Sequence, residues 1–400
     1  MRVALNQPRA NLIGGATVLP PGEGGVVPAP WIAGLRPYKR RLIQNPAGPE
    51  DNAVLRLDSN EGIGPPPFVV AELPAFLQRP GAISHYPDED CSALVQGLSA
   101  YVGRPAQEIV VFCGADGALE AISRAFLSPD DEAILVSPSY DQFRVFVELA
   151  GARPRFVNGG ESPLDFSAMH FLQGSRIAPS AKLIYLVNPN NPAGYLIEED
   201  AIVEIARAFP SSLVVVDETY IEFAAHAGSA TRLLDHVANV IVVRSFSKAF
   251  GLAGLRLGYA VANAHTAQIL HKVRNVKSVT ALSQVAGLAA LAQIENYRSQ
   301  FSQLRATRDW FAGALRAAGV TVHVGHANFV LMEAESPPAL AAALARDGIR
   351  VRDLSWMDRM ERYLRITIAT RDQMAIVLRR LLRLVAEDER RSIGRQYAND

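Results

Sequence analysis

Three features that often decide a protein's class are missing from this sequence of 400 residues. It has two cysteines, Cys91 and Cys113, which are too few for a disulfide framework and lie far from any histidine cluster, so we expect no metal site. The 40 Lys and Arg balance the 40 Asp and Glu, so we expect no nucleic-acid and no acidic-membrane partner. No run of about eighteen apolar residues occurs, and polar residues interrupt the N-terminus, which predicts a cytoplasmic protein.

The dinucleotide-binding fingerprint is also missing. No Gly-x-Gly-x-x-Gly follows an apolar run, and Gly251-x-x-Gly254 has the wrong spacing, which argues against a nicotinamide-dependent dehydrogenase. The even balance of charge leaves small molecules as the expected ligands. With 49% hydrophobic residues the chain can bury a full core, and its length predicts a large domain with a smaller companion.

Glycine and proline are concentrated in residues 1–50, where they disfavour the interior of helices and strands alike. We expect this segment to form an arm, which could lie over a partner subunit. The segment 57–67 after it is a polar, turn-forming cluster with three consecutive prolines.

The central part of the chain alternates short β-branched runs with helical segments, a pattern typical of a parallel sheet covered by helices. Five predicted strands each end at a polar or aromatic motif. Ligands of such sheets bind at the carboxyl ends of the strands, so we expect the five motifs to form one site. The strands are expected at residues 108–112, 133–136, 183–187, 213–216 and 240–243.

After residue 261 the pattern changes to long amphipathic helices mixed with a few strands. We expect helices at 264–274, 282–318, 338–347 and 372–387, strands at 328–333 and 363–368, and an earlier helix at 89–102. This predicts a large domain at 81–275 and a smaller α+β domain made of 51–80 with 276–400.

Lys248 is the residue around which the predicted site is organised. It lies among small, hydroxyl-bearing and apolar residues, where loss of hydration lowers the pKa of an amine and favours the neutral form that attacks a carbonyl. Ser245, Ser247 and Arg256 offer the donors expected around a phosphate. An aldehyde that carries its own phosphate would fit both features, whereas the alternative is a lysine in an exposed turn after a buried strand.

The order Ser-x-Ser-Lys, followed eight residues later by Arg, resembles the lysine motif of fold type I aminotransferases that use pyridoxal phosphate (PLP). Further motifs are Asn-Pro-Asn-Asn-Pro-x-Gly at 188–194, Asp-Glu-x-Tyr at 217–220 and Leu-Arg-Ile-Thr at 364–367. From about residue 56 to 382 the chain resembles the histidinol-phosphate aminotransferase group. The resemblance implies a mostly parallel sheet covered by helices, a PLP cofactor bound to Lys248 as a Schiff base, and a homodimer with shared active sites.

A PLP enzyme also needs a carboxylate for the pyridine nitrogen and an aromatic side chain against the ring face. Asp217 ends a buried strand, where a carboxylate needs a cationic or strongly hydrogen-bonding partner, and a pyridinium would be that partner. Tyr220 and Asn191 can reach the phenolic oxygen of the cofactor, and Tyr140 is the candidate for ring stacking. Without a cofactor, these residues would be a strand-end cap, ordinary turn residues and a core tyrosine.

The resemblance assigns the remaining candidate residues. The cofactor phosphate would be bound by Ala115, Asp116, Ser245, Ser247 and Arg256, with Tyr86 reaching it from the partner subunit. Arg365 would hold an anionic group of the substrate, Arg352 would assist, and Asn60 and Glu61 would lie at the mouth of the site.

The expected reaction is transamination between an anionic amino substrate, histidinol phosphate or an α-amino acid, and a 2-oxo acid. Three residues depart from the usual pattern of the group, namely Gly117, Ala193 and Ala369, and they make the substrate the open question. A PLP-dependent decarboxylase, cyclising lyase or oxidase on the same fold is the main alternative. A binding or regulatory protein that kept the fold is weaker, because the lysine is present and no DNA-binding domain is attached.

Overall fold

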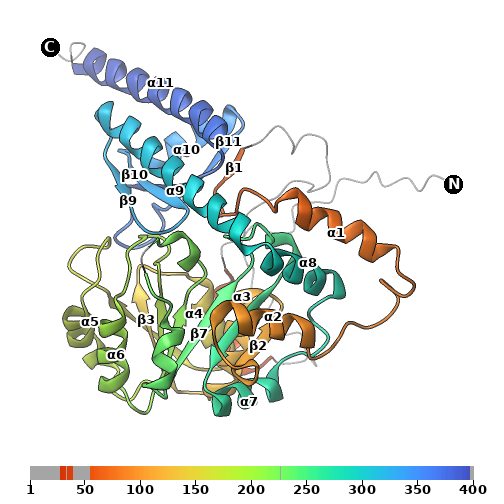
Figure 1. Cartoon of the computed structure of the whole chain (residues 1–400). Coiled ribbons are helices and arrows are strands. Elements are labelled where there is room, and N and C mark those ends of the chain that lie inside the picture. Colours follow the sequence, from red (N-terminus) through yellow and green to blue (C-terminus); the bar gives the residue numbers. More distant parts are fainter. Residues whose placement is uncertain (1–27, 33, 39–54, 226, 397–400) are drawn as a thin grey trace, which may run out of the picture.

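Two β-sheets, each with its own helices, organise the chain (Figure 1). The structure is a computed structural model and describes residues 28–32, 34–38, 55–225 and 227–396. The larger sheet has the strand order β2-β8-β7-β6-β5-β3-β4, and all of its neighbours pair in parallel except β8, which is antiparallel to both β2 and β7. Its strands are β2 (Ile109–Phe112), β3 (Glu132–Ser137), β4 (Arg153–Asn158), β5 (Leu183–Val187), β6 (Leu213–Asp217), β7 (Val240–Ser245) and β8 (Gly258–Ala262).

The central strands of this sheet are buried along their whole length, because helices cover both faces. Side chains alternate between the faces. Val215 and Ile241 pack into a core with helices from one face, whereas Val214 and Val242 pack into the larger core on the other. The first core includes α3 (Gly114–Phe126), α4 (Gln142–Leu149) and α7 (Ala264–Val273), and the second includes α2 (Ser92–Val102), α5 (Ala168–Gly174) and α6 (Glu199–Ala208).

The smaller sheet has the order β1-β11-β12-β10-β9 and lies above the larger one in Figure 1. The strand β1 pairs in parallel with β11, so segments that lie almost 300 residues apart in the chain meet in this sheet. Its elements are β1 (Leu55–Leu57), β9 (Val322–Val324), β10 (Phe329–Glu333), β11 (Ile349–Asp353) and β12 (Tyr363–Thr367), with α9 (Ile294–Ala317), α10 (Pro337–Arg346) and α11 (Arg371–Gln396) beside them.

The predicted fold class, a mostly parallel sheet covered by helices with a smaller second sheet, is confirmed. Three predicted helices differ in their bounds by more than one residue, and the one expected at 372–387 is α11, which continues to Gln396. The expected helix at 282–318 is two helices, α8 (Ala281–Ala292) and α9, because Gln293 leaves the helical region with φ −119° and ψ 30°. The helix expected from residue 89 begins at Ser92, after Cys91 adopts a left-handed conformation with φ 52°. The domain boundaries drawn from the sequence remain a prediction.

Part of the predicted N-terminal arm contacts its own chain. A short 3-10 helix, η1 (Pro30–Ile32), places Trp31 where its indole Nε1 donates to the backbone oxygen of Leu149 at 3.2 Å. Arg144 of α4 donates to the backbone oxygen of Arg36 at 3.1 Å. The rest of the predicted arm lies outside the described residues.

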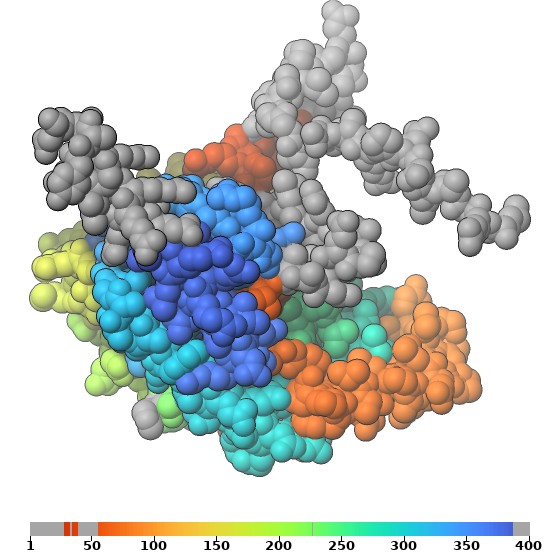
Figure 2. All heavy atoms as spheres, turned by 90° about the horizontal axis from the view of Figure 1, so that it is seen from above, coloured from red at the N-terminus to blue at the C-terminus, as the bar shows by residue number. Residues whose placement is uncertain are grey.

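A projecting segment formed by α1 (Pro67–Leu77) and the residues after it extends away from the body of the molecule (Figures 1 and 2). Within the described chain, no helix is both long enough and apolar enough to span a membrane.

Candidate active site

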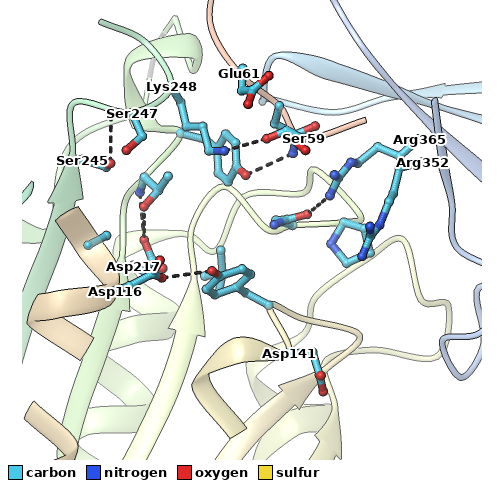
Figure 3. A pocket seen from close by; sticks show the side chains of 18 of the residues that line it. Ser59, Glu61, Asp116, Asp141, Asp217, Ser245, Ser247, Lys248, Arg352 and Arg365 are labelled. Atoms are coloured by element: carbon cyan, nitrogen blue, oxygen red, sulfur yellow. Dashed lines mark hydrogen bonds between the residues drawn. The ribbon is translucent and has the colours of Figure 1, made fainter. Parts of the chain in front are cut away.

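A cavity of about 420 Å³ opens where the carboxyl ends of β5, β6 and β7 face the smaller sheet (Figure 3). Every predicted site residue except Tyr86 lines it. The strand-end motifs therefore converge as the parallel topology requires, and residues of the smaller sheet complete the other wall. The predicted residues that it brings together are Asn60, Glu61, Ala115, Asp116, Tyr140, Asn191, Asp217, Tyr220, Ser245, Ser247, Lys248, Arg256, Arg352 and Arg365.

Lys248 projects into the cavity, and its amine donates a hydrogen bond of 2.7 Å to the backbone oxygen of Ser59. Burial and, to a smaller extent, the positive charge of Arg365 together lower the pKa of Lys248 to about 8. A charged amine is disfavoured where water is excluded and another cation is near. A larger share of Lys248 than of an ordinary lysine is therefore neutral and nucleophilic near neutral pH.

Asp217, the last residue of β6, is buried and held by three hydrogen bonds. Its carboxylate accepts from the hydroxyl of Tyr185 at 2.8 Å and from the backbone nitrogen and hydroxyl of Thr219 at 3.0 and 2.6 Å. Burial raises the pKa of Asp217, and these hydrogen bonds oppose the rise. Tyr185 is itself fixed by a stacked contact with Phe143 at 4.1 Å between ring centroids.

Tyr220 connects the larger sheet to the polar segment after β1. Its hydroxyl accepts from Asn60 Nδ2 at 3.1 Å, and the backbone nitrogen of Asn60 donates to Thr367 on β12 at 3.0 Å. Burial raises the pKa of Tyr220 to about 12, so the phenol keeps its proton at neutral pH. One chain of hydrogen bonds thus joins both walls of the cavity.

Arg365 and Arg352 stand directly opposite each other on the paired strands β12 and β11 (Figure 3). Arg365 donates to Asn191 Oδ1 and to the backbone oxygen of Asp58, and its Nε has no hydrogen-bond partner within the described chain. Burial lowers the pKa of Arg365, and the charge of Arg352 adds to this effect. No carboxylate of the described residues forms an ion pair with either arginine, although like charges directly opposite each other on paired strands destabilise a sheet.

A polar cluster lies around the start of α3. Arg256 contacts the carboxylate of Asp116 at 3.3 Å and the hydroxyl of Ser247 at 3.4 Å, and Tyr140 donates to Asp116 at 3.0 Å. The first backbone N–H groups of α3 have no partner within the helix, which makes its start a site for an anion. Glycine permits the close packing, because a Cβ at position 258 would lie 2.5 Å from the backbone nitrogen of Ala115.

Residues 52–381 match the family model for class I and II aminotransferases. The chain belongs to this family. This aminotransferase is 34% identical to a histidinol-phosphate aminotransferase of Methanococcoides burtonii, over 82% of this chain and 89% of that protein. It is also 33% identical to a dihydroxyacetone phosphate transaminase of Campylobacter jejuni, over 82% of this chain and 89% of that protein. The crystal structure of histidinol-phosphate aminotransferase from Sinorhizobium meliloti in complex with pyridoxal-5'-phosphate matches with a TM-score of 0.76 and 27% identity, over 89% of this chain and 97% of that chain.

The sequence-based prediction of a fold type I, PLP-dependent aminotransferase similar to the histidinol-phosphate group is confirmed. The site geometry fits that cofactor. Asp217 is a buried carboxylate without a cation in contact among the described residues, Lys248 carries an amine of lowered pKa, and the start of α3 offers N–H donors beside Arg256. Within the described chain no group of three or more His, Cys, Asp or Glu could hold a metal ion.

Tyr86 lies outside the cavity of its own subunit. It is 76% exposed, and the amine of Lys277 lies 4.1 Å from the centre of its ring. Glu61 lines the cavity and forms an ion pair of 3.1 Å with Arg56.

Some residues of the aminotransferase site were missed in the sequence. Tyr38 lines the cavity beside Tyr140, and Trp356 lines it beside Arg352. Tyr185 lies within a fully buried apolar strand, where a tyrosine resembles any core residue. The backbone oxygen of Ser59 could not be predicted as a site atom, because every residue type has a main-chain oxygen. The Pro37-Tyr38 pair and the Trp356-Met357 pair are apolar residues in polar loops, which is the one signal that could have drawn attention to them.

Proposed function

We propose that this aminotransferase moves an amino group from an anionic amino donor, histidinol phosphate or an α-amino acid, to a 2-oxo acid. The observation that carries the proposal is the presence of Lys248 and the two arginines in one cavity. The lysine amine is partly neutral, and Arg352 and Arg365 have no carboxylate partner among the described residues.

The residues that would hold PLP all line the cavity. The N–H groups of Ala115 and Asp116, the hydroxyls of Ser245 and Ser247, and Arg256 would bind the phosphate. Asp217 would face the ring nitrogen, oriented by Tyr185 and Thr219. Tyr220 and Asn191 would lie near the phenolic oxygen and Tyr140 against the ring. When bound, PLP supplies an electron sink for the negative charge that develops when the α proton leaves.

Lys248 has the position and acidity for the proton transfer. A base works best when its pKa lies near the working pH, and burial brings that of Lys248 to about 8. Its Nζ would take the α proton from the donor as a general base and give it up again as a general acid. The backbone oxygen of Ser59, 2.7 Å from Nζ, would hold the amine on the substrate side of the cavity.

The two arginines would bind the anionic group of the donor and, in the reverse half of the reaction, the carboxylate of the 2-oxo acid. A guanidinium binds a carboxylate or a phosphate ester through two parallel hydrogen bonds. Such an anion would also relieve the repulsion between the facing cations.

Steady-state kinetics of Arg365→Ala and Arg352→Ala test this proposal. We expect Arg365→Ala to raise the KM of every productive donor by about 30- to 4000-fold, since removing one partner of a buried charge pair costs roughly 2–5 kcal/mol. We expect Arg352→Ala to act selectively, with a larger effect on a phosphorylated donor than on a plain amino acid. If Arg365→Ala leaves every KM unchanged, the donor is not bound in this way.

We also propose that the enzyme is a cytoplasmic homodimer in which Tyr86 of one subunit reaches the phosphate of the other. The exposure of Tyr86, its absence from the cavity of its own subunit and its place in the projecting segment after α1 support this arrangement.

A further inference from the structure

Asn60, in the segment after β1, has a backbone conformation that few side chains tolerate. Its φ is 53°, in the left-handed region, where asparagine is found more often than most residues that carry a Cβ. The residue is buried, so its polar groups need partners within the protein. The conformation of Asn60 therefore depends on the residues that satisfy these groups.

Two residues of the smaller sheet bind the main chain of Asn60. Its nitrogen donates to the hydroxyl of Thr367 on β12 at 3.0 Å, and its oxygen accepts from Nδ2 of Asn328 at 3.1 Å. Asn328 directly precedes β10, and its backbone oxygen accepts from the nitrogen of Ile368 at 2.8 Å. Asn328 and Thr367 are both buried, and they form a clamp that is anchored on the paired strands β10 and β12.

The clamp also orients the side chain of Asn60. Its Oδ1 accepts from the hydroxyl of Thr367 at 3.2 Å, which leaves its Nδ2 to donate to the hydroxyl of Tyr220 at 3.1 Å. With the amide turned the other way, the hydroxyl hydrogen of Thr367 would have no acceptor among the described residues. Thr367 therefore fixes which end of the Asn60 amide meets Tyr220.

This arrangement determines where the hydroxyl hydrogen of Tyr220 points. A phenol donates one hydrogen and accepts through its lone pairs. Asn60 is the donor in its bond to Tyr220, so that bond does not use the phenol hydrogen, and no other described residue accepts it. The Tyr220 ring is held edge-on against Phe329 at 5.8 Å between centroids. The hydrogen is thus left for a ligand in the cavity that Tyr220 lines.

Asn328 is a poor choice for stability alone. Its Oδ1 is buried and has no hydrogen-bond partner within the described chain. An unpaired buried amide oxygen destabilises a fold, and an apolar side chain would avoid that loss. The bond from its Nδ2 to Asn60 is the contact that explains an amide at this position.

We propose that Asn328 and Thr367 are positioning residues that act through Asn60 to direct the hydroxyl hydrogen of Tyr220 at the phenolic oxygen of PLP. The inference rests on the proposed placement of PLP beside Tyr220, and it adds two residues that do not line the cavity. Asn60 then acts on Tyr220 rather than on the substrate. A hydrogen bond donated to an anionic oxygen favours the charged form. The clamp therefore lowers the pH at which bound PLP loses its proton.

Spectrophotometric pH titration of the PLP-loaded enzyme, without any donor, measures this effect. The visible absorbance of bound PLP changes when it loses its proton, so the midpoint reports on the hydrogen bond and not on turnover. We expect Tyr220→Phe to raise the midpoint by about one to two pH units, the size of a hydrogen bond to a charged group. Thr367→Val and Asn328→Leu keep the phenol but release its direction, and each should raise the midpoint by roughly half a unit to one unit.

Double variants separate positioning from a general structural effect. Thr367→Val should shift the midpoint by less than about 0.3 units when Tyr220→Phe is already present, because the hydrogen that it directs is gone. Thr367→Ser keeps the hydroxyl and should keep the parent midpoint. Asn60→Gly tolerates the left-handed backbone but lacks the amide, so it should shift the midpoint as Thr367→Val does.

Thr307→Val provides the matched control. Thr307 is buried on α9 and does not line the cavity, so the same substitution there should leave the midpoint unchanged. Thermal unfolding and PLP content establish that each variant is folded and loaded. If Asn328→Leu fails to load PLP, the isosteric Thr367→Val decides the outcome.

An unchanged midpoint in Thr367→Val, or an equal shift with and without the Tyr220 hydroxyl, would overturn the proposal. No shift in Tyr220→Phe would overturn it as well, since the phenol would then not reach PLP. The proposed function is judged separately by the KM values of Arg365→Ala, because the titration contains no donor.

Discussion

Lys248 shows how surroundings rather than residue type set chemistry at the scale of a single residue. The side chain is buried, faces the charge of Arg365 and donates to a backbone oxygen that cannot neutralise it. The neutral amine is therefore the favoured form at pH values well below the usual pKa of lysine. The lowered pKa also makes the stability of the fold depend on pH. Between about pH 8 and the ordinary lysine pKa, this amine is protonated in the unfolded chain but neutral in the folded chain. The fold therefore becomes more stable as pH rises through that window.

The pH dependence of Lys248 labelling tests this view. We expect the rate of acetylation of Lys248 by a trace of acetic anhydride, in enzyme freed of cofactor, to rise with a midpoint near pH 8. Peptide mass spectrometry gives the rate for each lysine, and the exposed Lys182 serves as the internal reference for reagent reactivity. A midpoint for Lys248 above pH 10 would show that the cavity does not desolvate the amine.

Residue patterns predicted those site residues that stand at the ends of buried strands. Asp217 directly follows an apolar run and Lys248 comes shortly after the next one, so their residue types are informative there. Tyr185 could not be found in this way, because it lies inside such a run and only the fold shows that its hydroxyl meets Asp217. The partner of Lys248 could not be found either, since it is a main-chain atom that any residue at position 59 could provide.

At the scale of elements, the segment after β1 packs tightly on the turn that carries Lys248. A Cβ built on Gly62 would lie 2.2 Å from the backbone oxygen of Lys248 and 3.0 Å from the Cα of Gly251. Both contacts are to main chain, which cannot rotate away. The absence of a side chain at position 62 is what lets the segment bearing Ser59 and Asn60 close over the lysine.

Gly62→Ala should therefore disturb the cavity without touching any group that reacts. We expect PLP to bind about tenfold more weakly to this variant, since overpacking costs roughly 1–3 kcal/mol. The measurement is the Kd of PLP from absorbance titration of enzyme freed of cofactor. Gly313→Ala is the control, because Gly313 is an exposed residue of α9 with no atom within 4 Å of an added Cβ, and its Kd should not change. Equal affinities for the parent and Gly62→Ala would show that the segment around position 62 shifts to accommodate the added methyl group without disturbing the cavity.

The larger sheet was predicted better than the elements around it. Its central strands are continuous β-branched runs that end in polar motifs, and this pattern is strong. β4 was missed, because most of its residues are exposed at the edge of the sheet and it contains Pro154. The break at Gln293 was missed as well, since no Gly or Pro marks it and both flanking helices continue the same amphipathic pattern.

On the scale of the whole molecule, the projecting segment has the surface features of a subunit interface. Along it, Val70 and Leu77 of α1 and the following Ile83 and Tyr86 are all exposed, and Ile83 is 82% exposed. Isolated exposed apolar residues are ordinary, but a row of them on one projection is typical of an interface. A second copy of the chain, with Tyr86 directed to its phosphate site, is the occupant that the proposed homodimer requires.

Hybrid dimers test that arrangement. A Tyr86→Ala variant and a Lys248→Ala variant should each be nearly inactive alone, and mixing them after dissociation should restore activity, because one of the two sites in each hybrid has both residues intact. Mixing equal amounts makes half of the dimers hybrid, so about one quarter of the parent activity is expected from random pairing. The control is a mixture of either variant with itself. A fully active monomer in sedimentation would contradict shared sites.

The pairing of β1 with β11 sets the order in which a newly made chain can acquire its active site. Leu55 is among the first described residues to be synthesised, but its partner Ile349 follows only after nearly the whole chain has been made, roughly 15 to 60 s later at ordinary rates of translation. The larger sheet is complete at Ala262 and can fold on the ribosome in the meantime. Asp58 and Asn60 are made early, but their partners on β12, Arg365 and Thr367, are made only when the chain is almost complete. A nascent chain therefore has its cofactor platform long before it has the arginines that give a substrate somewhere to bind.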